Sequence, residues 1–289
     1  MSDPRPIGVF DSGVGGLTVL REIIRRSPEE STIYLGDNAR APYGTRSDAE
    51  VRAFSTEALD ALADRDVKAI VVACNTSTAV ALGDFRRRYD LPILGVVRPG
   101  AVTAALTTRN RRVGVIATPA TVRSHAYFAA IKDENPAVEV YEHATPAFVP
   151  LVEAGQLSGP EVEAAVADGL APLLGERDPR GEFVFPLPAS ARIDTLLLGC
   201  THYPLIGAVI AAIAGEGVAI VDSATATASA LSELLAINGL EASSPMAGSG
   251  ASHVQLTTGD IDAFRSVARR LFGDTFVDIE AVELAAVAS

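Results

Sequence analysis

Short apolar runs rich in β-branched residues recur along the chain, and stretches with helical spacing lie between them. Most of the runs lack polar alternation, so we expect strands buried on both faces, as in parallel sheets. Between the first two runs, Leu17, Leu20 and Ile23 share one helical face, and Ser27 with Pro28 ends the pattern. Alternating units of this kind predict an α/β architecture. The predicted strands are 7–10, 32–35, 69–73, 93–97, 113–117, 138–141, 195–198, 218–221 and 254–256.

Local signals refine the ends of these elements. Residues 47–50 and 158–161 each place a serine three positions before a glutamate, which predicts a capping box at a helix start. Two segments without a clean period, 176–191 and 241–252, are expected as surface excursions. The alanine-rich residues after Leu284 are expected to fray.

Composition and charge exclude several classes of protein. The chain has 289 residues, 48% hydrophobic and 21% charged, which is typical of globular proteins and long enough for about two domains. The net charge is −12, and the arginines form no single stripe, so we expect no nucleic-acid partner. No export signal is visible at the start, so we expect a cytoplasmic protein.

One uncharged stretch calls for a test of membrane insertion. Residues 195–215 carry no charge over about the length that spans a bilayer. The sequence GCTHYP at 199–204 interrupts the stretch, and its polar groups and proline would be stranded in hydrocarbon. We therefore predict a buried strand, a turn and a helix, and no membrane partner.

The two cysteines of the chain lie in segments that share one plan. AIVVACNTSTA (69–79) and TLLLGCTHYPL (195–205) each lead from an apolar strand through a small residue to a cysteine, a polar side chain and a helix start. Cys74 and Cys200 are thus expected at the carboxyl ends of parallel strands, where ligands bind in open α/β sheets. A cytosolic setting disfavours a disulfide, and two thiols alone cannot form a four-ligand zinc site.

Thiols at helix N-termini can do proton-transfer chemistry. The positive end of the helix dipole favours the thiolate and lowers the pKa of a thiol from about 8.5. The alternative is that each cysteine only fills space in the core, as free cysteines often do. Two equivalent thiols that face each other across a cleft suit the inversion of a stereocentre, because one removes the α-proton and the other returns a proton to the opposite face.

The loop DSGVGG follows the first predicted strand and begins at Asp11. It does not match the dinucleotide pattern GxGxxG, because counted from Gly13 the third glycine position is Thr18. We expect its backbone N–H groups and the Ser12 hydroxyl to face an anionic group of a substrate. Asp11 is either a helix cap or a catalytic group. His202 is placed two residues after the second cysteine and can assist its proton transfers.

Other polar positions carry weaker signals. The motif GDNARAPYG (36–44) is typical of a turn, and a turn can direct backbone N–H donors toward a carboxylate. Thr118 precedes a proline and is a good helix N-cap, so Thr118 and Thr121 are capping residues by default. Lys68 and Lys132 are expected on the surface. The chain lacks GxxxxGK[ST] and HExxH motifs and a lysine in an apolar setting, so a nucleotide, metal or pyridoxal cofactor is not indicated.

Six motifs, in this order, resemble those of the cofactor-independent glutamate racemases: DSGVGGLTVL, GDNARAPYG, VACNTSTA, GVIATPAT, FVPLVEAG and LGCTHYPL. The resemblance covers residues 7–282 and implies interconversion of L- and D-glutamate without cofactor or metal. It implies that D-glutamate feeds peptidoglycan synthesis in the bacterial cytoplasm and that the protein is a homodimer. The implied fold has two similar α/β domains, with largely parallel sheets flanked by helices and the active site in the cleft between them. Residues 1–97 with 207–289 would form the first domain and 98–206 the second.

The resemblance also implies roles for individual residues. Cys74 would act on D-glutamate with the help of Asp11, and Cys200 on L-glutamate with the help of His202. The matched substrate-binding positions are Asp11, Ser12, Tyr43, Gly44, Asn75, Thr76, Thr201 and His202, with Thr118, Thr121 and Glu153 as further cleft positions.

Alternatives and departures remain beside this interpretation. An aspartate or hydantoin racemase would use the same two thiols, and some racemases of this family also inhibit DNA gyrase by contact, which the net charge of −12 suits. Arg98 stands where the family often has glutamate, and 176–191 is longer than the family leads one to expect. The first predicted strand begins six residues into the chain, so we expect no activation by a UDP-linked muramyl precursor.

Overall fold

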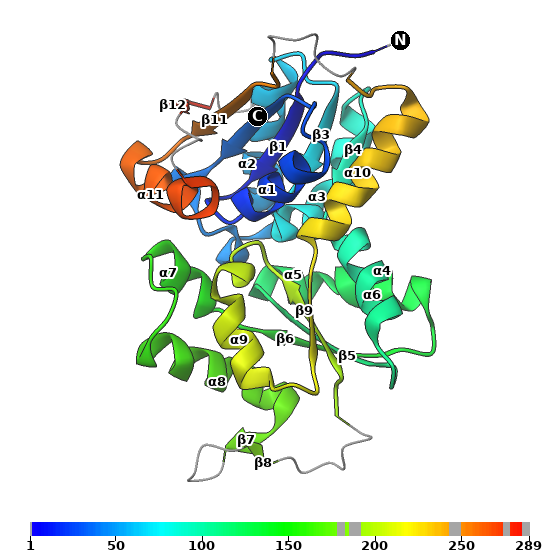
Figure 1. The fold of residues 1–289 in the computed structure, drawn as a ribbon, viewed down its shortest axis with the longest axis vertical. Coiled ribbons are helices and arrows are strands. Elements are labelled where there is room, and N and C mark those ends of the chain that lie inside the picture. The colour runs from blue at the N-terminus through cyan, green and yellow to red at the C-terminus, as the bar shows by residue number, and fades with distance from the viewer. Residues whose placement is uncertain (1, 178–182, 185–191, 243–249, 274–277, 285–289) are drawn as a thin grey trace.

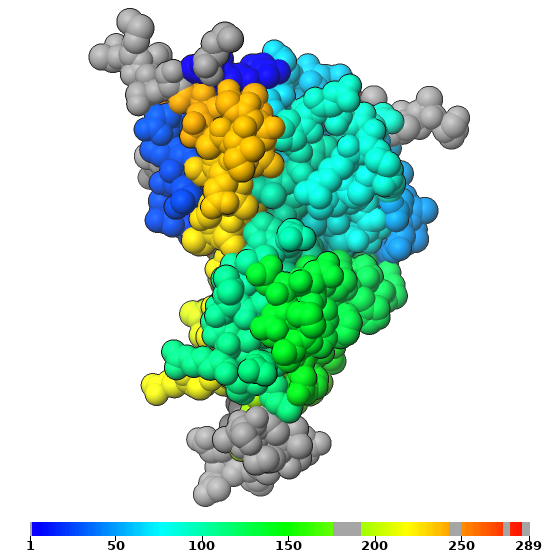
Figure 2. Space-filling view, turned by 90° about the vertical axis from the view of Figure 1, so that its right-hand side faces the viewer, coloured from blue at the N-terminus to red at the C-terminus, as the bar shows by residue number. Residues whose placement is uncertain are grey.

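The computed structural model describes residues 2–177, 183–184, 192–242, 250–273 and 278–284. These residues form two lobes, each built on a parallel sheet (Figure 1). Figure 2 shows the lobes from the side, the second one formed mainly by the residues coloured green. A fold of two α/β domains is therefore confirmed.

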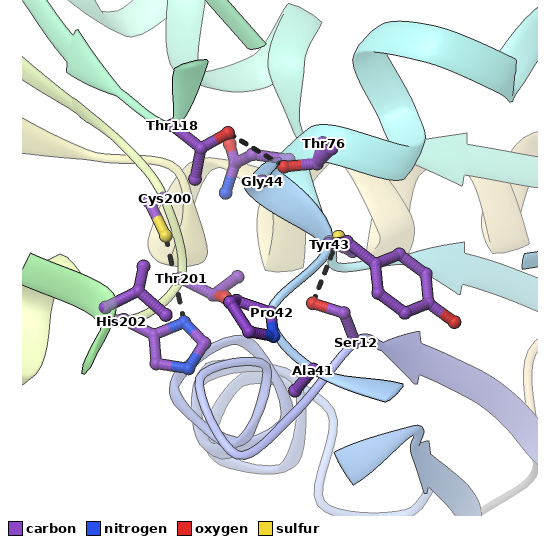
Figure 3. A pocket seen from close by; sticks show the side chains of 13 residues that line it. Ser12, Ala41, Pro42, Tyr43, Gly44, Thr76, Thr118, Cys200, Thr201 and His202 are labelled. Atoms are coloured by element: carbon purple, nitrogen blue, oxygen red, sulfur yellow. Dashed lines mark hydrogen bonds between the residues drawn. The ribbon is translucent and has the colours of Figure 1, made fainter. Parts of the chain in front are cut away.

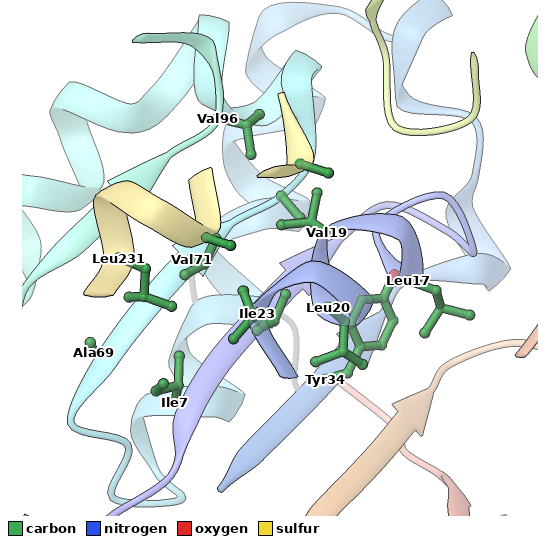
Figure 4. Close-up of a cluster of buried hydrophobic side chains, with 14 of the residues drawn as sticks. Ile7, Leu17, Val19, Leu20, Ile23, Tyr34, Ala69, Val71, Val96 and Leu231 are labelled. Carbon is green, nitrogen blue, oxygen red and sulfur yellow. The ribbon is translucent and has the colours of Figure 1, made fainter. Parts of the chain in front are cut away.

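The sheet of the first lobe has six parallel strands in the order β12-β11-β2-β1-β3-β4. Helices α1, α10 and α11 pack on one face, and α2 and α3 pack on the other. Figure 4 shows the first of these layers, where Leu20 and Ile23 of α1 lie over the sheet near Leu231 of α10. The bounds are β1 (Ile7–Asp11), α1 (Leu17–Arg26), β2 (Thr32–Gly36), α2 (Asp48–Ala63), β3 (Ala69–Val72), α3 (Asn75–Arg88), β4 (Ile93–Gly95), α10 (Ala224–Asn238), β11 (His253–Thr257), α11 (Ile261–Phe272) and β12 (Ile279–Ala281).

The second lobe contains a four-stranded parallel sheet in the order β10-β9-β5-β6. One face is covered by α4 and α6, and the other by α7, α8 and α9. A short antiparallel pair joins β7 (Glu176–Arg177) to β8 (Phe183–Val184). The other bounds are α4 (Val97–Thr107), β5 (Arg112–Ala117), α5 (Pro119–Ser124), α6 (Ala126–Glu134), β6 (Glu139–Ala144), α7 (Phe148–Glu153), α8 (Pro160–Leu174), β9 (Thr195–Gly199), α9 (Gly207–Ala214) and β10 (Ala219–Asp222).

The chain passes between the lobes twice, once before α4 and once after β10. The predicted return at residue 207 differs from the observed strand pairing, because β10 lies beside β9 with Ala219 opposite Thr195. The apolar run of β10 completes the second sheet, and the chain returns to the first lobe only with α10, which packs on α1. We accordingly propose that the second domain extends to Asp222.

All nine predicted strands are present, because buried β-branched runs leave few alternatives. Val97 was wrongly predicted as strand and begins α4, while β12 was missed because its three residues carry too short a pattern. The capping box at 47–50 is confirmed. The one at 158–161 is wrong: α8 starts at Pro160, and Gly159 supplies the N-cap without a side-chain hydrogen bond.

The prediction that Lys68 lies on the surface is wrong, because this side chain is buried. Its ammonium group lies 2.5 Å from the carboxylate of Glu30 and donates to the backbone carbonyl of Asp3 at 2.8 Å. Both partners come from segments next to the start of a strand, so a charge that looks ordinary in sequence is neutralised only by the tertiary fold.

Three of the predicted irregular regions, 176–191, 241–252 and the end after Leu284, fall largely outside the described residues. The uncharged stretch 195–215 contains β9, a turn and α9, as predicted. In the described part of the chain, no helix is both long and apolar enough to cross a bilayer.

Candidate active site

Both cysteines follow the carboxyl ends of parallel strands, as the sequence predicts. Cys74 comes after β3 and is the N-cap of α3; its sulfur accepts from the Ser77 N–H at 3.4 Å, and its thiol donates to Ser12 Oγ at 3.5 Å. Cys200 directly follows β9, but the next helical element is a 3₁₀ turn, Tyr203–Ile206, and α9 begins only after it. The two positions are therefore equivalent at the strand and different at the helix.

The two sulfur-bearing residues line one cavity, which lies between the lobes. The space between its lining residues, counted out to the open solvent at its mouth, is about 310 Å³. In Figure 3, Cys200 and His202 lie on one side of it, and Ser12 and Tyr43 on the other. The lining residues are Ser12, Ala41, Pro42, Tyr43, Gly44, Cys74, Asn75, Thr76, Thr118, Val149, Cys200, Thr201 and His202.

Three of the predicted site residues lie behind this lining. Asp11 is fully buried and accepts from the backbone N–H groups of Gly13 at 3.1 Å and Gly16 at 3.0 Å. Thr121 and Glu153 do not line the cavity themselves but hydrogen-bond to lining residues, Thr121 to Thr118 and Glu153 to His202. The fold thus brings every predicted site residue to the cavity or next to it.

The electrostatic setting of Cys74 differs from what its helix position predicts. Burial and, to a lesser extent, the nearby Asp11 carboxylate raise the pKa of this thiol to about 11, although its hydrogen bonds with Ser12 and Ser77 act in the opposite direction. Burial also raises the pKa of Asp11 to about 6, although His202 and the N–H groups of the glycine loop oppose it. The expectation of a lowered cysteine pKa is therefore wrong for Cys74, because desolvation outweighs the helix dipole.

Cys200 has a histidine and a carboxylate as partners. Its sulfur lies 3.7 Å from His202 Nδ1, and His202 Nε2 lies 2.5 Å from Glu153 Oε1. Burial lowers the pKa of His202, but the bonds to Cys200 and Glu153 outweigh it and hold that pKa well above its usual value. The same histidine holds the pKa of Glu153 below its usual value against the effect of burial. An imidazolium between a sulfur and a carboxylate is the favoured state.

The glycine loop of the first lobe lies directly against the Cys200 side. The Thr201 hydroxyl donates to Asp11 Oδ1 at 3.3 Å. A Cβ on Gly15 would come within 2.5 Å of Thr201 Oγ1 and 2.6 Å of His202 Nδ1, and one on Gly13 within 2.7 Å of Glu153 Oε1. Glycine is needed here because the loop backbone approaches the second lobe too closely for any side chain.

Three threonine hydroxyls from both lobes form a buried cluster at the cavity. Thr76 Oγ1 on α3 lies 3.0 Å from Thr118 Oγ1 and 3.3 Å from Thr121 Oγ1, and the last two are 3.0 Å apart. Thr118 is also the N-cap of α5, as predicted, and accepts from the Thr121 N–H. The side chain of Thr118 therefore both caps α5 and lines the cavity.

Two buried residues were missed by the sequence analysis. Asp37 accepts from the Tyr43 hydroxyl, from Arg40 Nε at 2.6 Å and from Thr258 Oγ1 at 2.7 Å, and so anchors the loop that lines the cavity. Tyr127 donates to Asn75. Asp37 lies in the motif GDNARAPYG, in which the sequence analysis assigned a role only to the turn and its backbone donors. Nothing in the sequence around Tyr127 indicates a role for it.

Among the residues that the structure describes, no three His, Cys, Asp or Glu side chains are grouped so as to hold a metal ion. The residues of the cavity instead offer hydroxyl, amide and backbone donors beside two thiols. Such a set can bind carboxylate groups and can exchange protons on two sides of a small ligand.

Comparison with known proteins agrees with this chemistry. A family model described as Asp/Glu/Hydantoin racemase matches residues 7–178. The glutamate racemase of Oceanobacillus iheyensis is 40% identical over 285 residues, covering 99% of this chain and 98% of its own. A crystal structure of a glutamate racemase isoform from Bacillus anthracis is 38% identical, covers 97% of this chain and 98% of its own, and has a TM-score of 0.86. One from Francisella tularensis, in complex with D-glutamate, is 34% identical with the same coverages and a TM-score of 0.82. The chain therefore belongs to the Asp/Glu/hydantoin racemase family and is a racemase enzyme.

Proposed function

We propose that the protein interconverts L- and D-glutamate, with Cys74 and Cys200 as the two proton-transfer groups. The observation that carries the proposal is one small cavity lined by both cysteines, each supplied by a different lobe. A two-base inversion needs its two proton-transfer groups on opposite sides of the α-carbon, because the α-proton leaves one face of the carbon and the new proton arrives at the other.

The cavity suits a small dicarboxylic amino acid. Its donors include the hydroxyls of Ser12, Thr76 and Thr118 and the amide of Asn75, and such groups bind carboxylates. Relatives of about 40% identity over nearly the whole chain are glutamate racemases, which favours glutamate over aspartate. Glutamate binding would place one carboxylate among these donors and the α-carbon between the sulfurs.

The reaction balances without an outside reagent. With D-glutamate, the Cys74 thiolate takes the α-proton, the electron pair stays on the α-carbon and carboxylate, and the Cys200 thiol delivers its proton to the opposite face. With L-glutamate the two roles exchange. Because burial and Asp11 hold the pKa of Cys74 at about 11, its thiolate must be favoured by positive charge, which the ammonium group of the substrate would bring into the cavity.

The flanking groups would hold protons for each side. On the Cys200 side, the His202 imidazolium donates toward the sulfur while Glu153 fixes the ring from behind. On the Cys74 side, the Ser12 hydroxyl and the Ser77 N–H orient the sulfur, and Asp11 supplies a carboxyl whose pKa of about 6 allows it to take up a proton near neutral pH. The D-glutamate formed would supply peptidoglycan synthesis in the bacterial cytoplasm.

The test is exchange of the α-proton in heavy water, without added cofactor. Wild-type protein should wash deuterium into both enantiomers of glutamate, as followed by NMR, and should leave aspartate unlabelled over the same period. The Cys74→Ser and Cys200→Ser variants serve as controls for the role of the thiols. Faster labelling of aspartate than of glutamate would assign the substrate to the shorter acid, and labelling of neither would reject the proposed function.

A further inference from the structure

The side chain of Asn75 is held at one end only. Its amide oxygen accepts from the Tyr127 hydroxyl, and within the described residues its amide nitrogen donates to no protein group. Asn75 is only 4% exposed and lines the cavity with both cysteines. Two N–H donors of a buried side chain are therefore left for a ligand, and the direction in which they point is set by what holds the oxygen.

The donor and acceptor counts fix the direction of this hydrogen-bond chain. A phenol carries one proton, and Tyr127 uses it on the Asn75 oxygen, so at 3.1 Å the Ser223 hydroxyl must donate to the Tyr127 oxygen. Burial raises the pKa of Tyr127, so the phenol keeps its proton. The hydrogen bonds therefore run in one direction: Ser223 donates to Tyr127, and Tyr127 donates to Asn75.

The three residues come from three separate parts of the fold. Asn75 begins α3 of the first lobe, Tyr127 lies on α6 of the second lobe, and Ser223 stands where the chain returns to the first lobe after β10. The ring of Tyr127 is fixed, because it is fully buried and a Cβ on Gly199 would lie 2.9 Å from its Cε2 atom. Ser223 is fixed as well, with its Oγ 2.2 Å from where a Cβ on Gly100 would lie. The hydroxyl therefore acts from a rigid support.

We propose that Tyr127 is a positioning residue for the substrate: its hydroxyl holds the Asn75 amide oxygen away from the cavity, so that both amide protons face a carboxylate group bound there. This inference rests on the proposed function for the identity of the ligand. Without the hydroxyl, the amide is free to rotate and to present its oxygen, which repels a carboxylate. The effect reaches the substrate only through Asn75.

The test is the Tyr127→Phe variant in steady-state racemisation of both enantiomers. Loss of one oriented contact to a charged group should raise KM for L- and D-glutamate by about tenfold each and change kcat by less than about threefold. In the Asn75→Ala background, the same substitution should change KM no further. An unchanged KM in the single variant, or an undiminished rise in the Asn75→Ala background, would overturn the inference.

Tyr89→Phe is the matched control. It also removes a hydroxyl from a partly buried tyrosine, one that donates to Asp60 at 2.6 Å outside the cavity, and it should lower thermal stability without raising KM. The orientation of Asn75 is also read independently of turnover, from the ¹⁵N–¹H signals of its side-chain amide. In the wild type these should show a fixed amide that Tyr127→Phe releases. If wild-type protein does not act on glutamate, the proposed function fails, while unaltered amide signals in Tyr127→Phe would refute the positioning role.

Discussion

The Cys74 side and the Cys200 side of the cavity end matched strands, yet their electrostatic surroundings are opposite. Cys74 has an α-helix N-terminus, hydroxyl and N–H donors and a carboxyl group, and its pKa is about 11. Cys200 has a histidine whose pKa is raised well above its usual value by the sulfur and by Glu153. A reaction that is symmetric in its product is thus carried by an asymmetric pair of groups. Matched topology places the sulfurs, and the neighbouring side chains decide where protons rest.

The largest expected effect comes from removing either sulfur. Cys74→Ser and Cys200→Ser should each lower kcat/KM by about 10³-fold or more, since a serine hydroxyl is a poor base at neutral pH and positioned acid–base groups contribute about 10² to 10⁴. Because L- and D-glutamate are equally stable, kcat/KM must fall equally in both directions. Circular dichroism of each enantiomer measures this, and a variant that keeps the wild-type rate would exclude its sulfur from the mechanism.

The asymmetry itself becomes visible in a one-way reaction that needs a single base. With a β-chloro analogue of glutamate, a thiolate removes the α-proton and chloride leaves. Cys200→Ser should retain this elimination for the D analogue, and Cys74→Ser for the L analogue. Elimination from the same enantiomer by both variants would contradict the assignment of the two faces.

A smaller effect is expected from Glu153→Gln, which changes only the Cys200 side. Loss of the carboxylate lowers the pKa of His202 toward its ordinary value, and the imidazolium is then lost at lower pH. The alkaline limb of the kcat/KM profile should therefore move to lower pH, with activity about tenfold lower where the imidazolium has been lost. Glu142→Gln removes the carboxylate 2.7 Å from His125, away from the cavity, and should leave the profile unchanged. A profile equally unmoved by Glu153→Gln would show that this carboxylate does not set the charge of His202.

The last effect concerns stability and not turnover, and it belongs to the Cys74 side. The pKa of Asp11 is raised in the folded state from an ordinary 3.8 to about 6, so the unfolded chain ionises this group more readily and ionisation costs stability as pH rises through that window. Asp11→Asn removes the cost. Relative to wild type, the variant should gain about 2 kcal/mol of unfolding free energy between pH 4 and pH 8, at 1.36 kcal/mol per pKa unit, because part of the ionisation of the unfolded chain has already occurred at pH 4. Denaturant titrations at both pH values test this, and parallel curves would show that the carboxyl is not desolvated.

Sequence reasoning was strongest where chemistry and strand ends coincide. Cys74 and Thr118 were found because each directly follows a recognisable apolar run, and His202 because it lies two residues after Cys200. Lys68 was misjudged, because its burial depends on Glu30 and on the N-terminal segment, which only the fold brings together. Tyr127 was missed because its role depends on a hydrogen bond from its hydroxyl to Asn75 of the other lobe. Local pattern predicts elements and their ends, while partners more than 30 positions apart depend on tertiary packing.

The pairing of β11 with β2 has a consequence for how the chain is made. His253 lies opposite Thr32, so the strand next to β2 in the first sheet is supplied by a segment more than 200 residues later. A nascent chain emerging from the ribosome must keep the edge of β2 open while the whole second lobe is synthesised, and open strand edges invite association with other chains. Such distant closure also slows folding. The racemase should thus depend on protection of that edge during translation, before any substrate can bind.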